Sequence, residues 1–220
     1  MHNLGFDVAH LLAGSMLVLS FVLLYQDRIT AVLNVFALQA IALSLSVAWQ
    51  AYIQEAPHLL VTAGIALAMK GFVIPTALHR IVRRLGIHRQ IEEVIGAGPT
   101  MLTGLGLVAL SILLVLPVGQ TVSLLVREDL AFALAVILMG LLMMITRRNA
   151  VTQIVGFMSM ENGLILAATG ARGMPLVVEV SVAFSVLIAL FVFAVFVFRI
   201  RERFDTIDIE ALDRMRGDRR

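Results

Sequence analysis

The stretch that decides the fold class is residues 130–145, which read LAFALAVILMGLLMMI and contain no charged or hydrogen-bonding side chain. A second apolar run, Leu176–Phe198, is interrupted only by Glu179 and two serines. Long uninterrupted runs are typical of helices that cross a bilayer, whereas an outer-membrane barrel shows ~10-residue segments of alternating character. The sequence therefore predicts an all-α fold, a polytopic membrane helical bundle.

The composition of the whole chain agrees with this reading. Of the 220 residues, 60% are apolar and 15% are charged, whereas a soluble domain is about 45–50% apolar and about 25% charged. This balance excludes a soluble globular enzyme. The chain has no cysteine, which excludes disulfides, thiolate chemistry and a cysteine-held iron–sulfur cluster.

Polar and Gly/Pro-containing breaks divide the chain into about seven membrane-spanning helices, at ~20 residues a span. We expect them near residues 8–24, 29–52, 58–81, 100–117, 130–145, 150–169 and 176–198. The break at 118–129 contains Leu124-Leu-Val126 and is expected to be partly helical. We divide the chain into a four-span part (1–129), a three-span part (130–199) and a tail (200–220).

The basic residues predict the orientation of these spans. Fourteen of the 17 lysines and arginines fall on the side of the C-terminus, two fall on the opposite side, and Lys70 lies inside a span. The positive-inside rule then predicts a cytoplasmic C-terminus and an outside N-terminus. The arginines set topology and do not indicate nucleic-acid binding. The loop at 80–99 and the tail are either solvated topology anchors or docking surfaces for partners or headgroups.

Two charged residues stand deep inside predicted spans. Lys70 lies about twelve residues into the third span, and Glu161 lies midway along the sixth, so a ~1.5 Å rise per residue puts them at similar depth. A charge at the bilayer centre costs about 2.5–3.5 kcal/mol on insertion scales, so such residues are expected to have a function. The pair either exchanges protons or locks two helices together. Pro75 is expected to kink the third span.

The remaining polar candidates each have two interpretations. Glu179 is either the outward end of a proton path or an interfacial acid, and Asn162 and Gln153 support either a proton relay or interhelical hydrogen bonds. The glycines Gly156, Gly163 and Gly170, spaced by seven, predict a close helix-packing seam. We interpret the other polar residues of the first three spans as packing or interface residues, namely His10, Asn34, Gln39, Trp49, Gln50 and His79. No catalytic motif or metal-ligand spacing is found in the sequence.

Several blocks resemble the E membrane subunit of hydrogenase 4, the HyfE family. They are TRRNAVTQIVGFMSMENG (146–163), PLVVE (175–179), IDIEALDRMRG (207–217) and KGFVIP (70–75). The last three spans are similar to NuoK of complex I and to the C subunit of Mrp antiporters, in which a mid-membrane glutamate serves proton translocation. By motif that glutamate is Glu161. Many relatives carry a further acid about six residues after the position of Glu179, where this chain has Ser185, so the second relay site departs from the pattern.

The resemblance implies a non-catalytic subunit of a complex I-like, group 4 hydrogenase-type assembly. It implies no cofactor in this chain, and antiporter-like membrane subunits and soluble subunits as partners. It also implies the lipid bilayer of a bacterial or archaeal inner membrane as surroundings. Our leading hypothesis is that the chain takes part in proton translocation through Glu161 and Lys70 and bridges antiporter-like subunits. The alternatives are a purely structural assembly subunit and a stand-alone proton-coupled transporter, which would normally show an internal repeat or paired broken helices.

Overall fold

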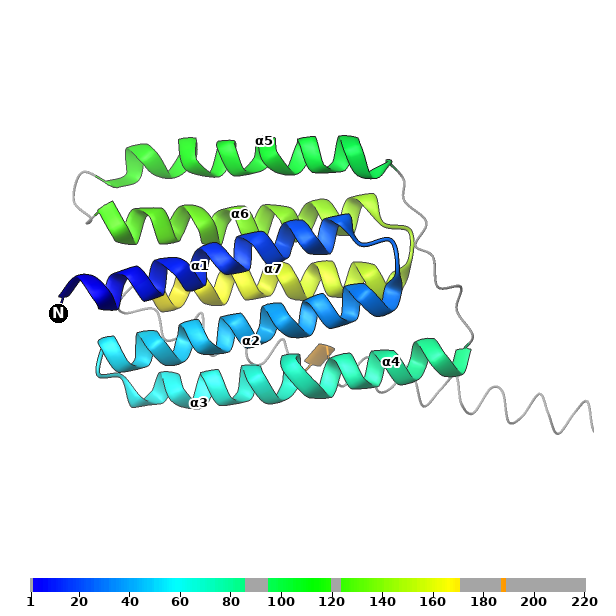
Figure 1. The fold of residues 1–220 in the computed structure, drawn as a ribbon, viewed down its shortest axis with the longest axis horizontal. Helices are drawn as coiled ribbons and strands as arrows, with labels where there is room; N and C mark the ends of the chain where they lie inside the picture. Colours follow the sequence, from blue (N-terminus) through cyan, green and yellow to red (C-terminus); the bar gives the residue numbers. More distant parts are fainter. Residues whose placement is uncertain (1, 86–94, 120–123, 171–186, 189–220) are drawn as a thin grey trace, which may run out of the picture.

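The computed structural model describes residues 2–85, 95–119, 124–170 and 187–188, and the regular elements of these ranges are helical (Figure 1). The predicted all-α fold is therefore confirmed. The elements are α1 (His2–Tyr25), α2 (Ile29–Ile53), α3 (Pro57–Ala66), the π-helix η1 (Leu67–Val73), α4 (Ile74–Leu85), α5 (Ala97–Val115), the 3₁₀ turn η2 (Leu116–Gly119), α6 (Leu124–Thr146) and α7 (Ala150–Gly170).

Six stretches of the described residues are long and apolar enough to cross a membrane. They are Asp7–Tyr25, Ile29–Ile53, Pro57–Arg83, Ala97–Val115, Arg127–Thr146 and Ala150–Gly170. They coincide with six of the predicted spans to within a few residues. The seventh, at 176–198, lies outside the described residues apart from Leu187 and Ile188, as do Glu179, Ser185 and the tail.

Local sequence signals explain where several helices begin. Pro57 occupies the first turn of α3, where its missing N–H is not needed. Asn149 precedes α7 and accepts a hydrogen bond from the Val151 backbone N–H at 2.8 Å, as a helix-capping side chain does. One boundary needs correction, because α4 continues to Leu85 and α5 begins at Ala97, so the predicted loop at 80–99 is shorter. The break at 118–129 is partly helical as expected, since α6 begins at Leu124.

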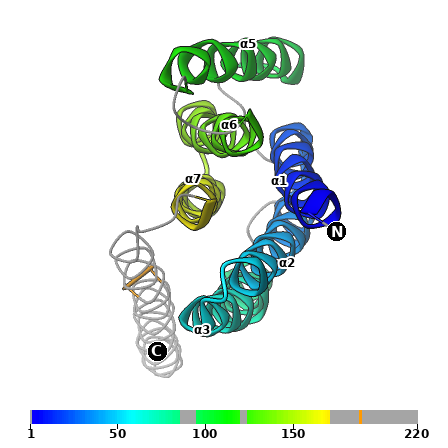
Figure 2. The ribbon, with the colours of Figure 1, turned by 90° about the vertical axis from the view of Figure 1, so that its left-hand side faces the viewer.

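The helices form two rows that face each other. Figure 2 shows α5, α6 and α7 side by side in one row, and α1, α2 and α3 in the other. The rows meet where α1 packs on α6 and α2 packs on α7. Two buried apolar clusters fill the interface at different depths. One includes Leu24, Phe36 and Val155, and the other includes Leu43 and Ile165. The residues between these clusters along α1, α2 and α7 form the polar layer described below.

Helices α6 and α7 approach each other most closely at glycines. A Cβ atom added to Gly140 would lie 2.5 Å from the Met160 backbone N, and one added to Gly163 would lie 2.9 Å from the Ala133 carbonyl oxygen. Gly156 faces the Gly140 carbonyl oxygen, which is 3.0 Å from its Cβ position. Gly170 has no described atom within 4 Å of that position. The contact thus uses Gly156 and Gly163 together with Gly140, which the spacing-seven pattern did not include.

A buried arginine ties this helix pair to α1. Arg147 follows α6, is 2% exposed, and donates from Nη2 to the Leu24 carbonyl oxygen at the C-terminal end of α1. Carbonyl groups at a helix C-terminus lack intrahelical partners and carry partial negative charge, so a guanidinium stabilises them. The sequence placed Arg147 among the residues that set topology, and the structure adds a packing role at this turn.

We expect Gly140→Ala to destabilise the bundle, because its methyl group would overlap the backbone of α7. Overpacking of this kind costs about 1–3 kcal/mol. Thermal unfolding of the purified chain in detergent would show a lower Tm. Gly106→Ala is the matched control, because no described atom lies within 4 Å of its Cβ position. An unchanged Tm for Gly140→Ala would contradict the close contact between α6 and α7.

Candidate functional site

Six buried polar side chains form one layer between the two apolar clusters, and we call this set the polar layer. They come from α1, α2, η1 and α7, and each is at most 3% exposed. The members are Ser20, Gln39, Lys70, Ser159, Glu161 and Asn162. Because buried polar groups are costly without partners, their mutual hydrogen bonds decide whether such a layer can exist.

The ion pair between Lys70 and Glu161 is the charged part of the layer. The Lys70 Nζ lies 3.1 Å from Glu161 Oε2 and donates to Asn162 Oδ1 at 2.9 Å. Lys70 is 0% exposed, so its charge is compensated inside the protein. The structure thus brings together the two charged residues that sequence depth had placed at the same level.

The backbone around Lys70 departs from an α-helix. Residues 67–73 form a π-helix, and the Ile74 N–H bonds to the Met69 carbonyl oxygen, five residues earlier. Pro75 follows directly, and it has no N–H with which to continue an α-helical ladder. Single π-helical turns in otherwise α-helical segments are often found at functional sites. The sequence predicted a kink at Pro75; what the structure shows before this residue is a widened π-helical turn, and that turn carries Lys70.

Amide groups continue the layer from Asn162 towards α1. Asn162 Nδ2 donates to Gln39 Oε1 at 3.2 Å. Gln39 Nε2 in turn donates to the hydroxyl oxygens of Ser20 and Ser159, at 2.9 and 3.0 Å. An ammonium can only donate, so Lys70 orients the Asn162 amide, and Asn162 then orients that of Gln39. The Lys70 ammonium therefore determines which group donates and which accepts in the hydrogen bonds that run from Lys70 through Asn162 to Gln39.

The chemistry available in the layer is divided between its members. Glu161 and Lys70 can change protonation state, and the serine hydroxyls can both donate and accept. The amides of Gln39 and Asn162 both donate and accept hydrogen bonds but do not change protonation state, so they hold the layer in one arrangement. Among the residues that the structure describes, no group of three or more His, Cys, Asp or Glu side chains is placed to hold a metal ion.

The other sequence candidates lie elsewhere. Gln153 is exposed and donates from Nε2 to the Arg147 carbonyl oxygen at 2.8 Å, so it does not join the layer. Trp49 Nε1 donates to the Gly5 carbonyl oxygen at 2.8 Å, as an interface residue would. The His79 ring nitrogen Nδ1 lies 2.9 Å from the Pro75 carbonyl oxygen. Glu179 lies outside the described residues.

Gln39 is the residue whose role the sequence interpretation missed, together with Ser20 and Ser159. We had interpreted Gln39 as a packing or interface residue. It is instead 0% exposed and is hydrogen-bonded to α1 and α7 at the centre of the bundle. Its position eleven residues into α2, at the depth of Glu161, was the available signal.

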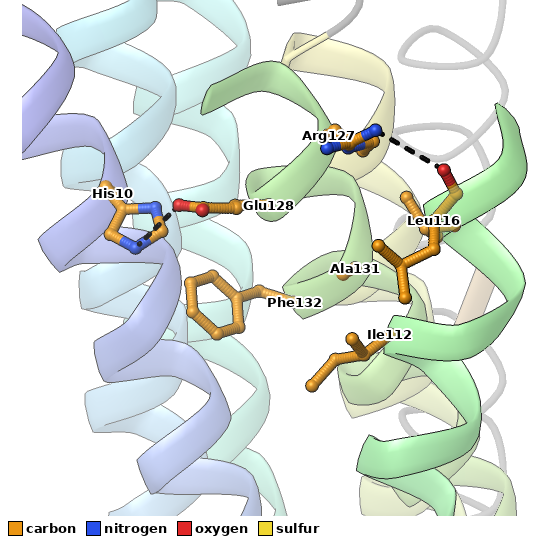
Figure 3. A pocket seen from close by; sticks show the side chains of 8 residues that line it. His10, Ile112, Leu116, Arg127, Glu128, Ala131 and Phe132 are labelled. Atoms are coloured by element: carbon orange, nitrogen blue, oxygen red, sulfur yellow. Dashed lines mark hydrogen bonds and ion pairs between the residues drawn. The ribbon is translucent and has the colours of Figure 1, made fainter. Parts of the chain in front are cut away.

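A second polar cluster lies at the end of the bundle where α1 begins. The His10 ring nitrogen Nδ1 lies 3.2 Å from Asp129 Oδ1, and its Nε2 lies 3.5 Å from Glu128 Oε2. The His10 ring also contacts Phe132, with 5.0 Å between ring centroids. These contacts tie α1 to α6 beside a cavity shown in Figure 3.

We expect Lys70→Met to lower the Tm of the purified chain more than the double variant Lys70→Met/Glu161→Gln does. Lys70→Met removes the ammonium beside the Glu161 carboxylate, and breaking a buried pair costs about 3–5 kcal/mol. The double variant leaves no charge at this site. Thermal unfolding of both single variants and the double variant in detergent gives the interaction free energy between the two side chains. Additive losses would contradict the importance of the ion pair.

No protein-family model matches the chain, and no solved structure matches it. It is 28% identical to an uncharacterized protein of Mycobacterium tuberculosis, over 98% of this chain and 100% of that protein. It is also 28% identical to hydrogenase-4 component E of Escherichia coli K12, over 97% of this chain and 99% of that protein. The same values hold for hydrogenase-4 component E of Shigella flexneri. These matches confirm the resemblance that the sequence blocks predicted, and the chain is similar to hydrogenase-4 component E along nearly its entire length.

Proposed function

We propose that this chain is a non-catalytic integral membrane subunit of a hydrogenase-type, complex I-like assembly, and that it takes part in proton translocation. The observation that carries the proposal is the Lys70–Glu161 ion pair, buried in a polar layer between apolar clusters of membrane-spanning helices. The similarity to hydrogenase-4 component E over 97% of the chain supports the kind of assembly.

The proposed mechanism is electrostatic. A proton that binds the Glu161 carboxylate neutralises it and leaves the Lys70 ammonium without its counter-charge. The ammonium is then compensated by a negative charge of a neighbouring subunit. When that charge moves, Glu161 releases its proton and the ion pair forms again. Asn162 and Gln39 keep their hydrogen bonds throughout and hold the helices in register.

The proposed partners are antiporter-like membrane subunits and the soluble subunits of the same assembly, in a bacterial or archaeal inner membrane with the C-terminus in the cytoplasm. Helix α5 offers a surface for such a membrane partner, because Leu102, Leu105 and Leu113 are 72%, 60% and 64% exposed. The four-span and three-span parts would act together, since the polar layer contains residues of both.

We expect Glu161→Gln to lower proton movement per electron transferred by about tenfold or more, because loss of a positioned acid–base group removes proton transfer. Inverted membrane vesicles with a pH-sensitive dye measure this, and a native gel checks that the complex assembles. Glu55→Gln is the matched control, because Glu55 is an exposed carboxylate in the turn between α2 and α3. Glu161→Asp should retain part of the activity. Normal pumping by an assembled Glu161→Gln complex would contradict the relay.

A purely structural role is the second candidate, favoured by the uninterrupted hydrogen bonds that join η1, α7, α2 and α1. The double variant Lys70→Met/Glu161→Gln separates the two candidates. If the ion pair is a structural lock, each single variant impairs assembly, and the double variant, which has no unpaired charge, assembles and pumps normally. A relay predicts that the assembled double variant does not pump.

A further inference from the structure

A wedge-shaped cavity of about 380 Å³ lies between α1, α5 and α6, away from the polar layer. Its shape follows from the changing separation of α1 and α5. A Cβ atom at Gly104 of α5 would lie 3.3 Å from the Phe21 side chain and 3.4 Å from that of Leu24. Ile112, two turns further along α5, and Leu116 of η2 line the cavity instead. The two helices therefore diverge towards the end of the bundle where α1 begins.

The walls and the rim of this cavity differ in chemistry. Ile112, Leu116 and Phe132 are apolar wall residues, whereas the polar His10 and the charged Arg127 and Glu128 form the rim. The rim residues belong to the first turns of the spans Asp7–Tyr25 and Arg127–Thr146, and Leu116 follows the end of Ala97–Val115. The ends of membrane-spanning helices lie at the boundary between hydrocarbon and water, which is where this rim would lie in a bilayer. An occupant must therefore be amphipathic, with its polar end at the rim.

The rim carries opposite charges on its two sides. Figure 3 shows Glu128 beside His10 near α1, and Arg127 close to Leu116 of η2. Arg127 Nη1 donates to the Leu116 carbonyl oxygen at 3.3 Å, and a guanidinium has further N–H groups to offer. Glu128 has 55% of its side chain exposed, so its carboxylate is accessible to a cation. Because both residues line the same cavity, the complementary head group carries both an anion and a cation.

We propose that this cavity binds one phospholipid whose zwitterionic head group ends in a primary ammonium. The phosphate bonds Arg127, the ammonium donates to Glu128, and the first part of one acyl chain lies along Ile112, Leu116 and Phe132. A cavity of this volume is sufficient for a head group and the upper part of a chain. A quaternary trimethylammonium has no N–H to donate to Glu128, and a glycerol head group has no cation.

The test is native mass spectrometry of the purified full chain, titrated with phosphatidylethanolamine, phosphatidylcholine or phosphatidylglycerol. We expect phosphatidylethanolamine to bind about tenfold more tightly than the other two, a difference typical of one charge-assisted hydrogen bond. Glu128→Gln should abolish this preference. Arg127→Gln should weaken all three lipids, and Ile112→Trp should do so by filling the cavity without changing any charge.

Matched controls test whether the effects are local. Glu55→Gln removes an exposed carboxylate at the same end of the bundle, and Arg83→Gln removes an exposed arginine of α4 at the other end. Both should bind lipid as the unmodified chain does, and lipid-free thermal unfolding checks the fold of every variant. Equal or tighter binding of phosphatidylglycerol would overturn the proposal. So would a lipid preference that survives Glu128→Gln, or one that Glu55→Gln also removes.

Discussion

The burial of one ammonium group is the constraint on which the rest of this structure depends. Lys70 is 0% exposed in a helix of membrane-spanning length, and a charge in such a place must be compensated by the protein. Glu161 and Asn162 provide that compensation from α7. This sets the depth of η1 relative to α7, and the bond from Asn162 to Gln39 extends the same register to α2. One charge thereby aligns three elements.

On the face of α7 away from the polar layer, close packing against α6 holds α7 in place. Gly140, Gly156 and Gly163 let α6 and α7 approach so closely that backbone atoms of one helix occupy the space that a Cβ atom on the other would need. Without a hydrophobic driving force between helices in lipid, such dispersion contacts and buried hydrogen bonds are what hold a bundle together. α7 thus uses one face for close packing and another for the polar layer. Its 3% exposed Glu161 and its glycines serve different neighbours.

The two polar regions of the molecule differ in depth and in accessibility, and this separates their chemistry. The polar layer lies between apolar clusters, so any proton that reaches Glu161 must travel through the protein. The rim formed by His10, Arg127 and Glu128 lies at the ends of spans and includes a carboxylate with 55% of its side chain exposed. The first region is suited to holding or exchanging charge, and the second to recognising a molecule at the bilayer boundary.

The sequence by itself predicted seven spans, and the six that lie in the described residues match long apolar helices there. It also determined the helical class and the common depth of Lys70 and Glu161, because apolar run length and helical rise are local properties of the chain. It did not determine which residues face one another. Gln39 was interpreted as a packing or interface residue, and Gln153 as support for either a proton relay or an interhelical hydrogen bond. Gln39 instead joins the layer, and Gln153 donates to the Arg147 carbonyl oxygen. The packing role of Gly140 likewise follows only from the structure, in which Gly140 lies against Gly156 of α7. Depth along a span follows from counting residues, whereas the rotation of each helix and the identity of its neighbours arise only when all the helices pack together.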